Sequence, residues 1–227
     1  MCVLEIINYS WDVDNPLTYK NRMGYYKTRT ELSFIKRHIP NNILLKILDI
    51  GGGSGRFAIP LKEEGHDVTV IDRSLSAINL CHRKGFLKAY CTDAIEFQSS
   101  EKYDFAIAIE VVEYFENFPT LLNKIREISD DKIKFVFTTH NKNSWRFRIR
   151  ALKKNKTEYN KYYLKDYLTD LNNCGFSVIE IKGFLWMPFR LSSNSILIPF
   201  FEKLENLLKL NRWIGQSPWL LIAVEKI

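Results

Sequence analysis

A run of glycines that begins two residues after an aspartate is the feature of this sequence with the clearest chemical meaning. Asp49 lies near the end of an apolar stretch, and glycines occupy positions 51–53 and 55. Glycine at a strand-to-helix turn lets a ligand approach the main chain, and the helix behind the turn supplies amide donors. The dinucleotide fingerprint G-x-G-x-x-G/A requires a small third residue, but Arg56 occupies that place. The turn therefore predicts a ligand site of another kind.

Three further acids follow apolar runs in the same way. They are Asp72, Asp93 and Glu110. The carboxyl ends of parallel strands meet at one edge of an open sheet, which is where such sheets bind ligands. Any one acid could instead cap a strand or solubilise a loop. Four acids at four successive strand ends together predict a single ligand site.

These acids can meet only if strands and helices alternate along the chain. Apolar runs predict strands over 43–50, 68–72, 86–91, 103–109, 133–139, 176–183 and 219–226. Helical spacing of apolar residues predicts helices over 28–39, 58–65, 75–85, 118–128, 144–156, 162–175 and 200–210. In the last of these, the inner stripe is expected to hold Phe201, Leu204 and Leu208. The alternation predicts a doubly wound α/β sheet.

The string from Asp49 to Gly55 resembles motif I of the class I S-adenosylmethionine (SAM) methyltransferases. The segment 104–117, which contains E-V-V-E, and the segment 168–181 are similar to later parts of the same family. The resemblance covers about residues 43–183 and a closing strand at 219–225. It implies a Rossmann-like, seven-stranded, mostly parallel sheet with an antiparallel last strand, SAM as the cofactor and S-adenosylhomocysteine (SAH) as its product.

The resemblance also implies a role for particular side chains. Asp49 and the glycine turn would hold the methionine part of SAM, Asp72 the ribose, and Asp93 with the backbone of Ala94 the adenine. Glu110 would lie under the methionine part. An N-terminal lid would reach the carboxylate of SAM. The expected cofactor-binding residues are Asp49, Gly51, Gly52, Gly53, Gly55, Asp72, Arg73, Asp93, Ala94, Glu110, Arg22 and Tyr19.

Methyl transfer from a sulfonium depends mainly on alignment of the acceptor, and a base is needed only for a hydroxyl or a protonated amine. His140, after the fifth strand, is the expected base, although a histidine in a loop often only bonds backbone. Tyr114 is the second catalytic candidate. It stands where similar O-methyltransferases of ubiquinone pathways have the histidine of E-x-x-E-H, and without that imidazole we expect no metal.

The acceptor is expected to be a small molecule methylated on O or N, with an anionic or amphipathic part. Neither the motif of enzymes that methylate exocyclic amino groups of bases nor a Pro-Cys pair occurs, so nucleic acid is not the expected acceptor. The net charge of +7 and the basic segment 146–156 suit an anionic partner. Aromatic and apolar residues of segment 183–191 are expected in the acceptor pocket or in the core.

Two alternatives to a methyltransferase are an NAD(P)-dependent oxidoreductase and a non-catalytic basic binding module on the same fold. We expect one domain over 1–227, with an N-terminal lid (1–42), a SAM-binding core (43–140) and a substrate-side half (141–227). The sequence shows neither a signal-peptide pattern nor an apolar window of about 18 residues, so a cytoplasmic protein without a membrane span is expected. The oligomeric state is left open.

Overall fold

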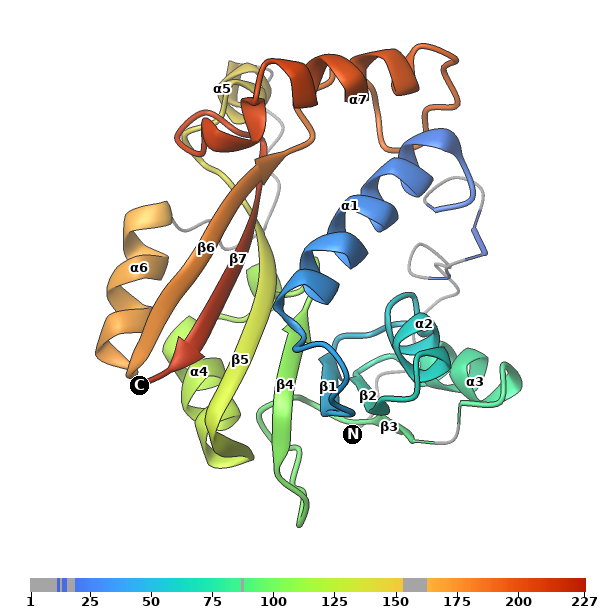
Figure 1. The fold of residues 1–227 in the computed structure, drawn as a ribbon, viewed down its shortest axis with the longest axis vertical. Helices are drawn as coiled ribbons and strands as arrows, with labels where there is room; N and C mark the ends of the chain where they lie inside the picture. The colour runs from blue at the N-terminus through green and yellow to red at the C-terminus, as the bar shows by residue number, and fades with distance from the viewer. Residues whose placement is uncertain (1–11, 13, 16–18, 87, 153–162) are drawn as a thin grey trace.

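The computed structural model describes residues 12, 14–15, 19–86, 88–152 and 163–227. These residues form one seven-stranded sheet with helices on both faces (Figure 1). Trp11 and residues 153–156 of the predicted basic helix lie outside the described residues.

The strands lie close to their predicted positions. In chain order they are β1 (Lys46–Ile50), β2 (Asp67–Asp72), β3 (Ala89–Cys91), β4 (Tyr103–Ala108), β5 (Ser129–His140), β6 (Phe176–Phe184) and β7 (Trp219–Lys226). β3 is shorter than expected and β5 is longer. β5 gains residues at its start, where a register shift against β4 lets Ser129 pair with Tyr103.

The sheet confirms the predicted fold class. Its strand order is β3-β2-β1-β4-β5-β7-β6. All neighbouring pairs among the first five strands of the chain are parallel, whereas β7 runs antiparallel to both β5 and β6. Strand order reverses between β1 and β4. The carboxyl ends of these two strands therefore diverge into connections on opposite faces, which leaves the crevice where doubly wound sheets bind ligands.

The helices are distributed between the two faces. They are α1 (Arg22–His38), α2 (Ala58–Glu63), α3 (Leu75–Arg83), α4 (Phe118–Glu127), α5 (Trp145–Leu152), α6 (Leu164–Asn173) and α7 (Ile198–Leu207), with 3₁₀ helices η2 (Val112–Tyr114) and η3 (Leu210–Arg212). Residues of α1, α2, α3 and α7 pack into one core and residues of α4, α6 and η2 into the other.

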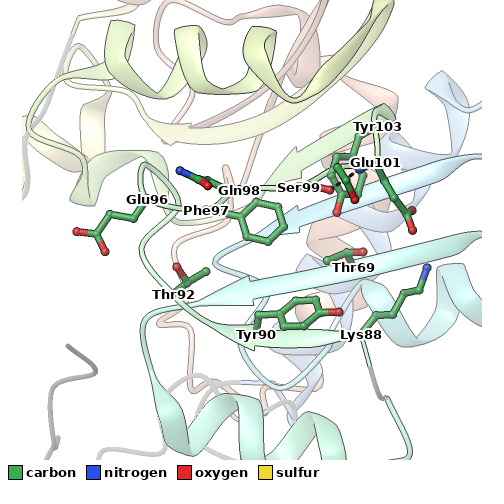
Figure 2. Close-up of a pocket in the computed structure, with 11 residues that line it drawn as sticks. Thr69, Lys88, Tyr90, Thr92, Glu96, Phe97, Gln98, Ser99, Glu101 and Tyr103 are labelled. Atoms are coloured by element: carbon green, nitrogen blue, oxygen red, sulfur yellow. Dashed lines mark hydrogen bonds between the residues drawn. The ribbon is translucent and has the colours of Figure 1, made fainter.

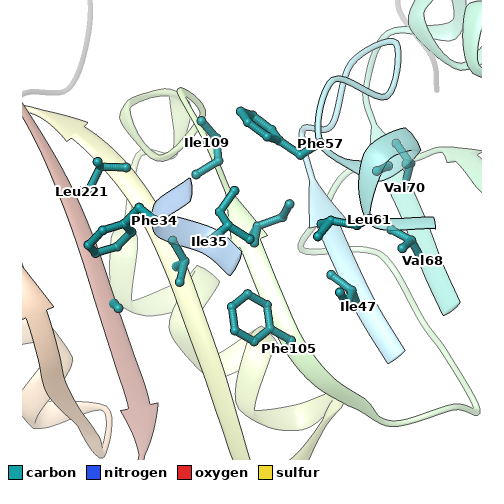
Figure 3. Close-up of a cluster of buried hydrophobic side chains, with 14 of the residues drawn as sticks. Phe34, Ile35, Ile47, Phe57, Leu61, Val68, Val70, Phe105, Ile109 and Leu221 are labelled. Carbon is teal, nitrogen blue, oxygen red and sulfur yellow. The ribbon is translucent and has the colours of Figure 1, made fainter. Parts of the chain in front are cut away.

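Helix α1, which belongs to the segment predicted as an N-terminal lid, packs into the core. Phe34 and Ile35 are fully buried against the sheet, close to Phe105 of β4 and Leu221 of β7 (Figure 3). The helix begins earlier than predicted because the side chain of Asn21 accepts a hydrogen bond from the Gly24 N–H at 2.9 Å.

Aromatic rings pack together on the other face of the sheet, beneath α4 and α6. Phe118 of α4 lies 5.2 Å from Phe137 of β5 and 5.0 Å from Tyr167 of α6, measured between ring centroids. The Tyr167 hydroxyl accepts a hydrogen bond from Thr139 at 2.9 Å. This contact satisfies the one polar atom that the ring brings into the core.

The buried stripe of α7 differs from the prediction. Phe201 packs inward against Phe189, but Leu208 lies beyond the end of the helix and is exposed. Glu205 takes the inner position, where its carboxylate accepts a hydrogen bond from the buried Tyr26 hydroxyl at 2.8 Å. A buried hydroxyl requires such a partner, and apolar periodicity could not reveal it.

None of the helices in the described part of the chain is long and apolar enough to cross a membrane.

A close approach in β6 yields the first prediction. A Cβ atom at Gly183 would lie 2.6 Å from the Cβ and Oγ atoms of the buried Ser217, whose hydroxyl bonds the carbonyls of Phe184 and Trp219. We expect Gly183→Ala to lower the free energy of unfolding by about 1–3 kcal/mol, because the added methyl overpacks this junction.

Gly215→Ala is the matched control, since a Cβ there meets no atom within 4 Å. Its effect should stay within about 0.5 kcal/mol in urea denaturation. Equal stability of the two variants would contradict the packing argument.

Candidate active site

The glycine turn joins β1 to α2 and is bare for two reasons. Gly51 has a φ of +66°, and a Cβ atom there would lie 2.5 Å from Val111. A Cβ on Gly52 would lie 2.7 Å from the carboxylate of Asp49. The protein's own packing therefore excludes side chains from this turn, which also leaves its backbone accessible to a ligand.

Asp49 lies beneath the turn and is 1% exposed. Its Oδ2 atom has no hydrogen-bond partner among the described residues. Burial raises the pKa of Asp49 to about 7 against the opposing charge of Arg56, and the nearby Asp72 adds to the rise. An acid held in this state responds strongly to any positive charge brought next to it.

Asp72, at the end of β2, holds the glycine turn. Its two carboxylate oxygens accept the N–H of Gly53 at 2.9 Å and the N–H of Ser74 at 2.8 Å. These two bonds fix the orientation of the carboxylate relative to the turn. The next residue, Arg73, is exposed, and its Nε lies 3.6 Å from the carboxylate of Asp93.

Asp93 and Ala94 form the turn that follows β3. The Asp93 side chain accepts the N–H of Ile95 at 2.9 Å, which fixes the carboxylate in a local turn. Ala94 is buried against the sheet, while Asp93 remains partly exposed at its edge. The geometry thus places a fixed acid and a small residue beside the end of β2.

Glu110, at the end of β4, is engaged in ion pairs. Its carboxylate contacts the ammonium of Lys27 and the guanidinium of Arg56. Burial acts to raise the pKa of Glu110, but these two cations outweigh it and lower the pKa to about 2. Its backbone has a φ of +63° and is held by a 2.7 Å hydrogen bond from its N–H to Thr138. The side chain of Glu110 therefore helps to hold α1 and Arg56 in place.

Arg56 is the centre of a charge cluster, which we call the buried charge cluster and which consists of the buried Lys27, Glu31 and Arg56 and the partly exposed Glu110. Arg56 Nη1 lies 3.0 Å from Glu31 Oε2, and Glu31 is completely buried. Burial raises the pKa of Glu31, although Arg56 and Lys27 act in the opposite direction. The guanidinium also lies 4.5 Å from the ring centroid of Tyr19, which covers it from the N-terminal side.

This cluster is not apparent from the glycine turn and the acids at strand ends that predict the site. Arg56 served only to exclude a dinucleotide site, and neither Lys27 nor Glu31 was assigned a role. A signal for them exists, because Lys27 and Glu31 are spaced i, i+4 on the same stripe of α1 as Met23 and Phe34. Charges of opposite sign on a buried helical stripe indicate partners in the core.

His140 ends β5 and is fixed on two sides. Its backbone N–H donates to the buried Glu113 at 2.8 Å, and burial raises the pKa of Glu113 to about 7. The centroid of its ring lies 3.8 Å from that of Trp219. The Nζ atom of Lys27 also lies over the Trp219 ring, 4.7 Å from the ring centroid. Tyr114, by contrast, is 63% exposed at the end of η2.

The N-terminal residues contact the site unequally. Tyr19 covers Arg56, and the Asp12 carboxylate accepts a hydrogen bond from the Ser54 hydroxyl of the glycine turn at 3.3 Å. Arg22 is exposed, and its backbone N–H donates to Asn194 at 3.0 Å. The role of the Arg22 side chain therefore stays a prediction.

The basic segment that begins at residue 146 has a structural task at its first residue. Arg146 donates to the backbone carbonyls of Met187 and Phe189, the latter at 2.8 Å. It thereby fixes the loop between β6 and α7, in which Leu185 and Met187 belong to the core. A small cavity beside His140 is bordered by Phe147 and Arg146.

A cavity of about 490 Å³ lies elsewhere, on the face of β2 and β3 under the loop that leads to β4 (Figure 2). Tyr90, Phe97 and Lys88 line it, and none of the predicted cofactor-binding residues does. We therefore do not assign the cofactor to it. Within the described ranges, His, Cys, Asp and Glu form no group of three or more that could hold a metal ion.

The chain matches known proteins over most of its length. Residues 21–181 match the model of a family described as "Methyltransferase domain". A ubiquinone biosynthesis O-methyltransferase from Rickettsia typhi is 30% identical over 202 residues, which span 81% of this chain and 80% of that protein.

Two solved structures share the fold. A SAM-dependent methyltransferase from Thermotoga maritima has a TM-score of 0.63 at 18% identity and covers 88% of this chain and 89% of its own. Magnesium protoporphyrin IX methyltransferase from Synechocystis, solved with bound SAH, has a TM-score of 0.63 at 15% identity, with 90% and 84% covered.

The buried charge cluster yields the second prediction. We expect Arg56→Met to lower the free energy of unfolding by about 3–5 kcal/mol, because Glu31 is then left as a buried charge without its guanidinium. Adding Glu31→Gln should restore part of that loss in urea denaturation.

Lys36→Met is the matched control, since Lys36 pairs with Glu64 at an exposed site. Its cost should remain below about 1 kcal/mol. If Arg56→Met proved as mild as Lys36→Met, the cluster would not hold the fold together.

Proposed function

The chain belongs to the class I SAM-dependent methyltransferase family, and from that premise we propose that it transfers the methyl group of SAM to a hydroxyl oxygen of a small-molecule acceptor. The choice of oxygen rests on the relatives named as O-methyltransferases and on His140, a base at the end of β5. A hydroxyl acceptor must lose its proton during transfer, and an imidazole is suited to take it near neutral pH. A cytoplasmic location is part of this proposal.

Residues at the carboxyl edge of the sheet fit the cofactor. SAM supplies a methyl group on a positively charged sulfonium and leaves as SAH. The bare turn at Gly51 and Gly52 and the Asp49 oxygen without a described partner suit its methionine part. Asp72 would accept the ribose hydroxyls while it holds the turn through Gly53.

The remaining predicted contacts follow from position. Asp93 and the backbone of Ala94 would receive the adenine beside the end of β3, with Arg73 at the rim. Tyr19 would close the methionine side, because it already covers Arg56 there. Glu110 would act through its backbone and its ion pairs, since both carboxylate oxygens contact cations.

The single observation that carries the role of His140 as general base, which a hydroxyl acceptor requires, is the way His140 is held. Glu113 fixes its backbone and Trp219 lies against its ring, so the imidazole has a defined position at the ligand edge of the sheet. Lys27 connects the same Trp219 to the charge cluster under the glycine turn. One connected set of contacts would thus hold the glycine turn beneath the cofactor and the base in fixed relative positions. The rate of methyl transfer depends on such positioning.

The titration of Asp49 gives the third prediction. Ionised Asp49 attracts a cationic ligand and neutral Asp49 does not, and its pKa is raised to about 7 by burial. The affinity for SAM should therefore increase as the pH rises from 6 to 7.5, by roughly five- to ten-fold. Isothermal titration calorimetry measures it.

Asp49→Asn keeps the size of the side chain but removes the charge. Its affinity for SAM should be lower at pH 7.5 and nearly independent of pH over the same range. A parent protein whose affinity does not change with pH would refute the assigned role of Asp49.

The fourth prediction concerns the reaction. Methyl-labelled SAM incubated with a metabolite extract and the enzyme should yield a labelled methyl ether, identified by mass spectrometry. With that acceptor, His140→Ala should lower kcat by roughly 10²–10⁴-fold, because the proton then has no positioned base. The Kd for SAM should not change.

Tyr114→Phe tests the second catalytic candidate and should have a smaller effect, since Tyr114 is exposed. A product methylated on nitrogen or carbon would overturn the hydroxyl proposal, and full activity of His140→Ala would remove His140 from the mechanism.

A further inference from the structure

The outer face of α7 is apolar, although its inner face already packs on the protein. Six exposed apolar side chains fall between residues 196 and 213, and together we call them the α7 patch: Ile196, Leu197, Phe200, Leu207, Leu208 and Trp213. Phe200 is 60% exposed and Leu207 is 77% exposed. Apolar side chains gathered in this way on a surface mark an interaction site more often than scattered ones do.

The spacing within α7 shows that the two patch residues on the helix itself, Phe200 and Leu207, lie on one helix face. Phe200, Leu204 and Leu207 stand at i, i+4 and i+7, so they follow one stripe of the helix. The opposite stripe contains Ile198, Phe201 and Glu205, which face the core. Helix α7 therefore has two apolar sides, of which only one is covered by the described chain.

The inner contacts fix α7 rigidly against the body. The Tyr26 hydroxyl donates to Glu205 at 2.8 Å, and Arg29 pairs with Glu202 at 2.6 Å. In Figure 1, α7 lies across one end of the molecule, beyond the sheet, with η3 packed beside it. The outer stripe is thus held facing away from the protein.

The exposed charges around the patch are all positive. Lys203, Lys209 and Arg212 are exposed among the apolar residues. The two acids of the same stretch, Glu202 and Glu205, are occupied by Arg29 and Tyr26 on the inner side. An apolar face with basic residues and an exposed Trp213 matches a surface that is apolar within and anionic outside, as the interface of an anionic bilayer is.

We propose that the α7 patch docks the enzyme onto the surface of a membrane that contains anionic lipid, with Phe200 and Leu207 entering the interface and Lys203, Lys209 and Arg212 lying among the headgroups. The protein would lie on the bilayer without crossing it. Docking is independent of the methyl acceptor. It would place the end of the molecule that carries α7 against the lipid.

Vesicle co-sedimentation of the full chain tests this docking. Vesicles of phosphatidylcholine with phosphatidylglycerol should bind the protein at least ten-fold more tightly than vesicles of phosphatidylcholine alone. Phe200→Glu combined with Leu207→Glu should abolish binding. Each single reversal among Lys203→Glu, Lys209→Glu and Arg212→Glu should weaken it by roughly five-fold or more.

Leu44→Glu is the matched control, because Leu44 is 71% exposed near the start of β1, at the opposite edge of the sheet. It should bind vesicles as the parent does, and circular dichroism with SAM binding should show that every variant is folded. The proposal fails if the parent binds neither vesicle. It also fails if the patch variants sediment like Leu44→Glu, or if they instead convert a dimer to a monomer in light scattering, which would assign the patch to a second copy.

Discussion

The structure depends on a cluster of four charges, three of them buried and that of Glu110 partly exposed, which must satisfy one another. Arg56 comes from the residues that follow the glycine turn, Lys27 and Glu31 from α1, and Glu110 from the end of β4. A buried ion without its partner costs several kcal/mol, so these three elements have to meet where the ions pair. The contact that joins α1 to the core therefore also holds the glycine turn beside the end of β4. Fold and site share one constraint.

The same constraint extends from the glycine turn, the proposed cofactor site, to His140 on the proposed acceptor side. Lys27 reaches both Glu110 and the ring of Trp219, and that ring lies against His140. A general base works only when it is held in position relative to the transferred group. In this protein the positions of His140, the proposed base, and of the glycine turn are set by neighbours in one set of contacts. The antiparallel β7, which carries Trp219, thus contributes to the site from the far half of the sheet.

The C-terminal part of the described chain combines rigid packing with an outward apolar face. Arg146 fixes the loop after β6 through two carbonyls, and Tyr26 with Glu205 fixes α7. These polar contacts lie on the inner sides of the loop and of α7. They stabilise both elements but do not cover the outer apolar face of α7. The outer stripe of α7 is therefore available for another surface, and its basic residues select an anionic one.

The sequence by itself determined the sheet, the glycine turn and the positions of the acids at strand ends. Apolar runs such as 103–109 and 133–139 fix strands locally, and glycine and aspartate at a turn have local conformational reasons. The sequence did not determine what Glu110 contacts, that α1 belongs to the core, or that Glu205 replaces Leu208 on the inner side of α7. Those outcomes depend on partners far along the chain, such as Arg56 for Glu110 and Tyr26 for Glu205. Only the tertiary structure decided them, because the pairing of buried polar groups is a property of elements packed together and leaves little periodicity in the sequence.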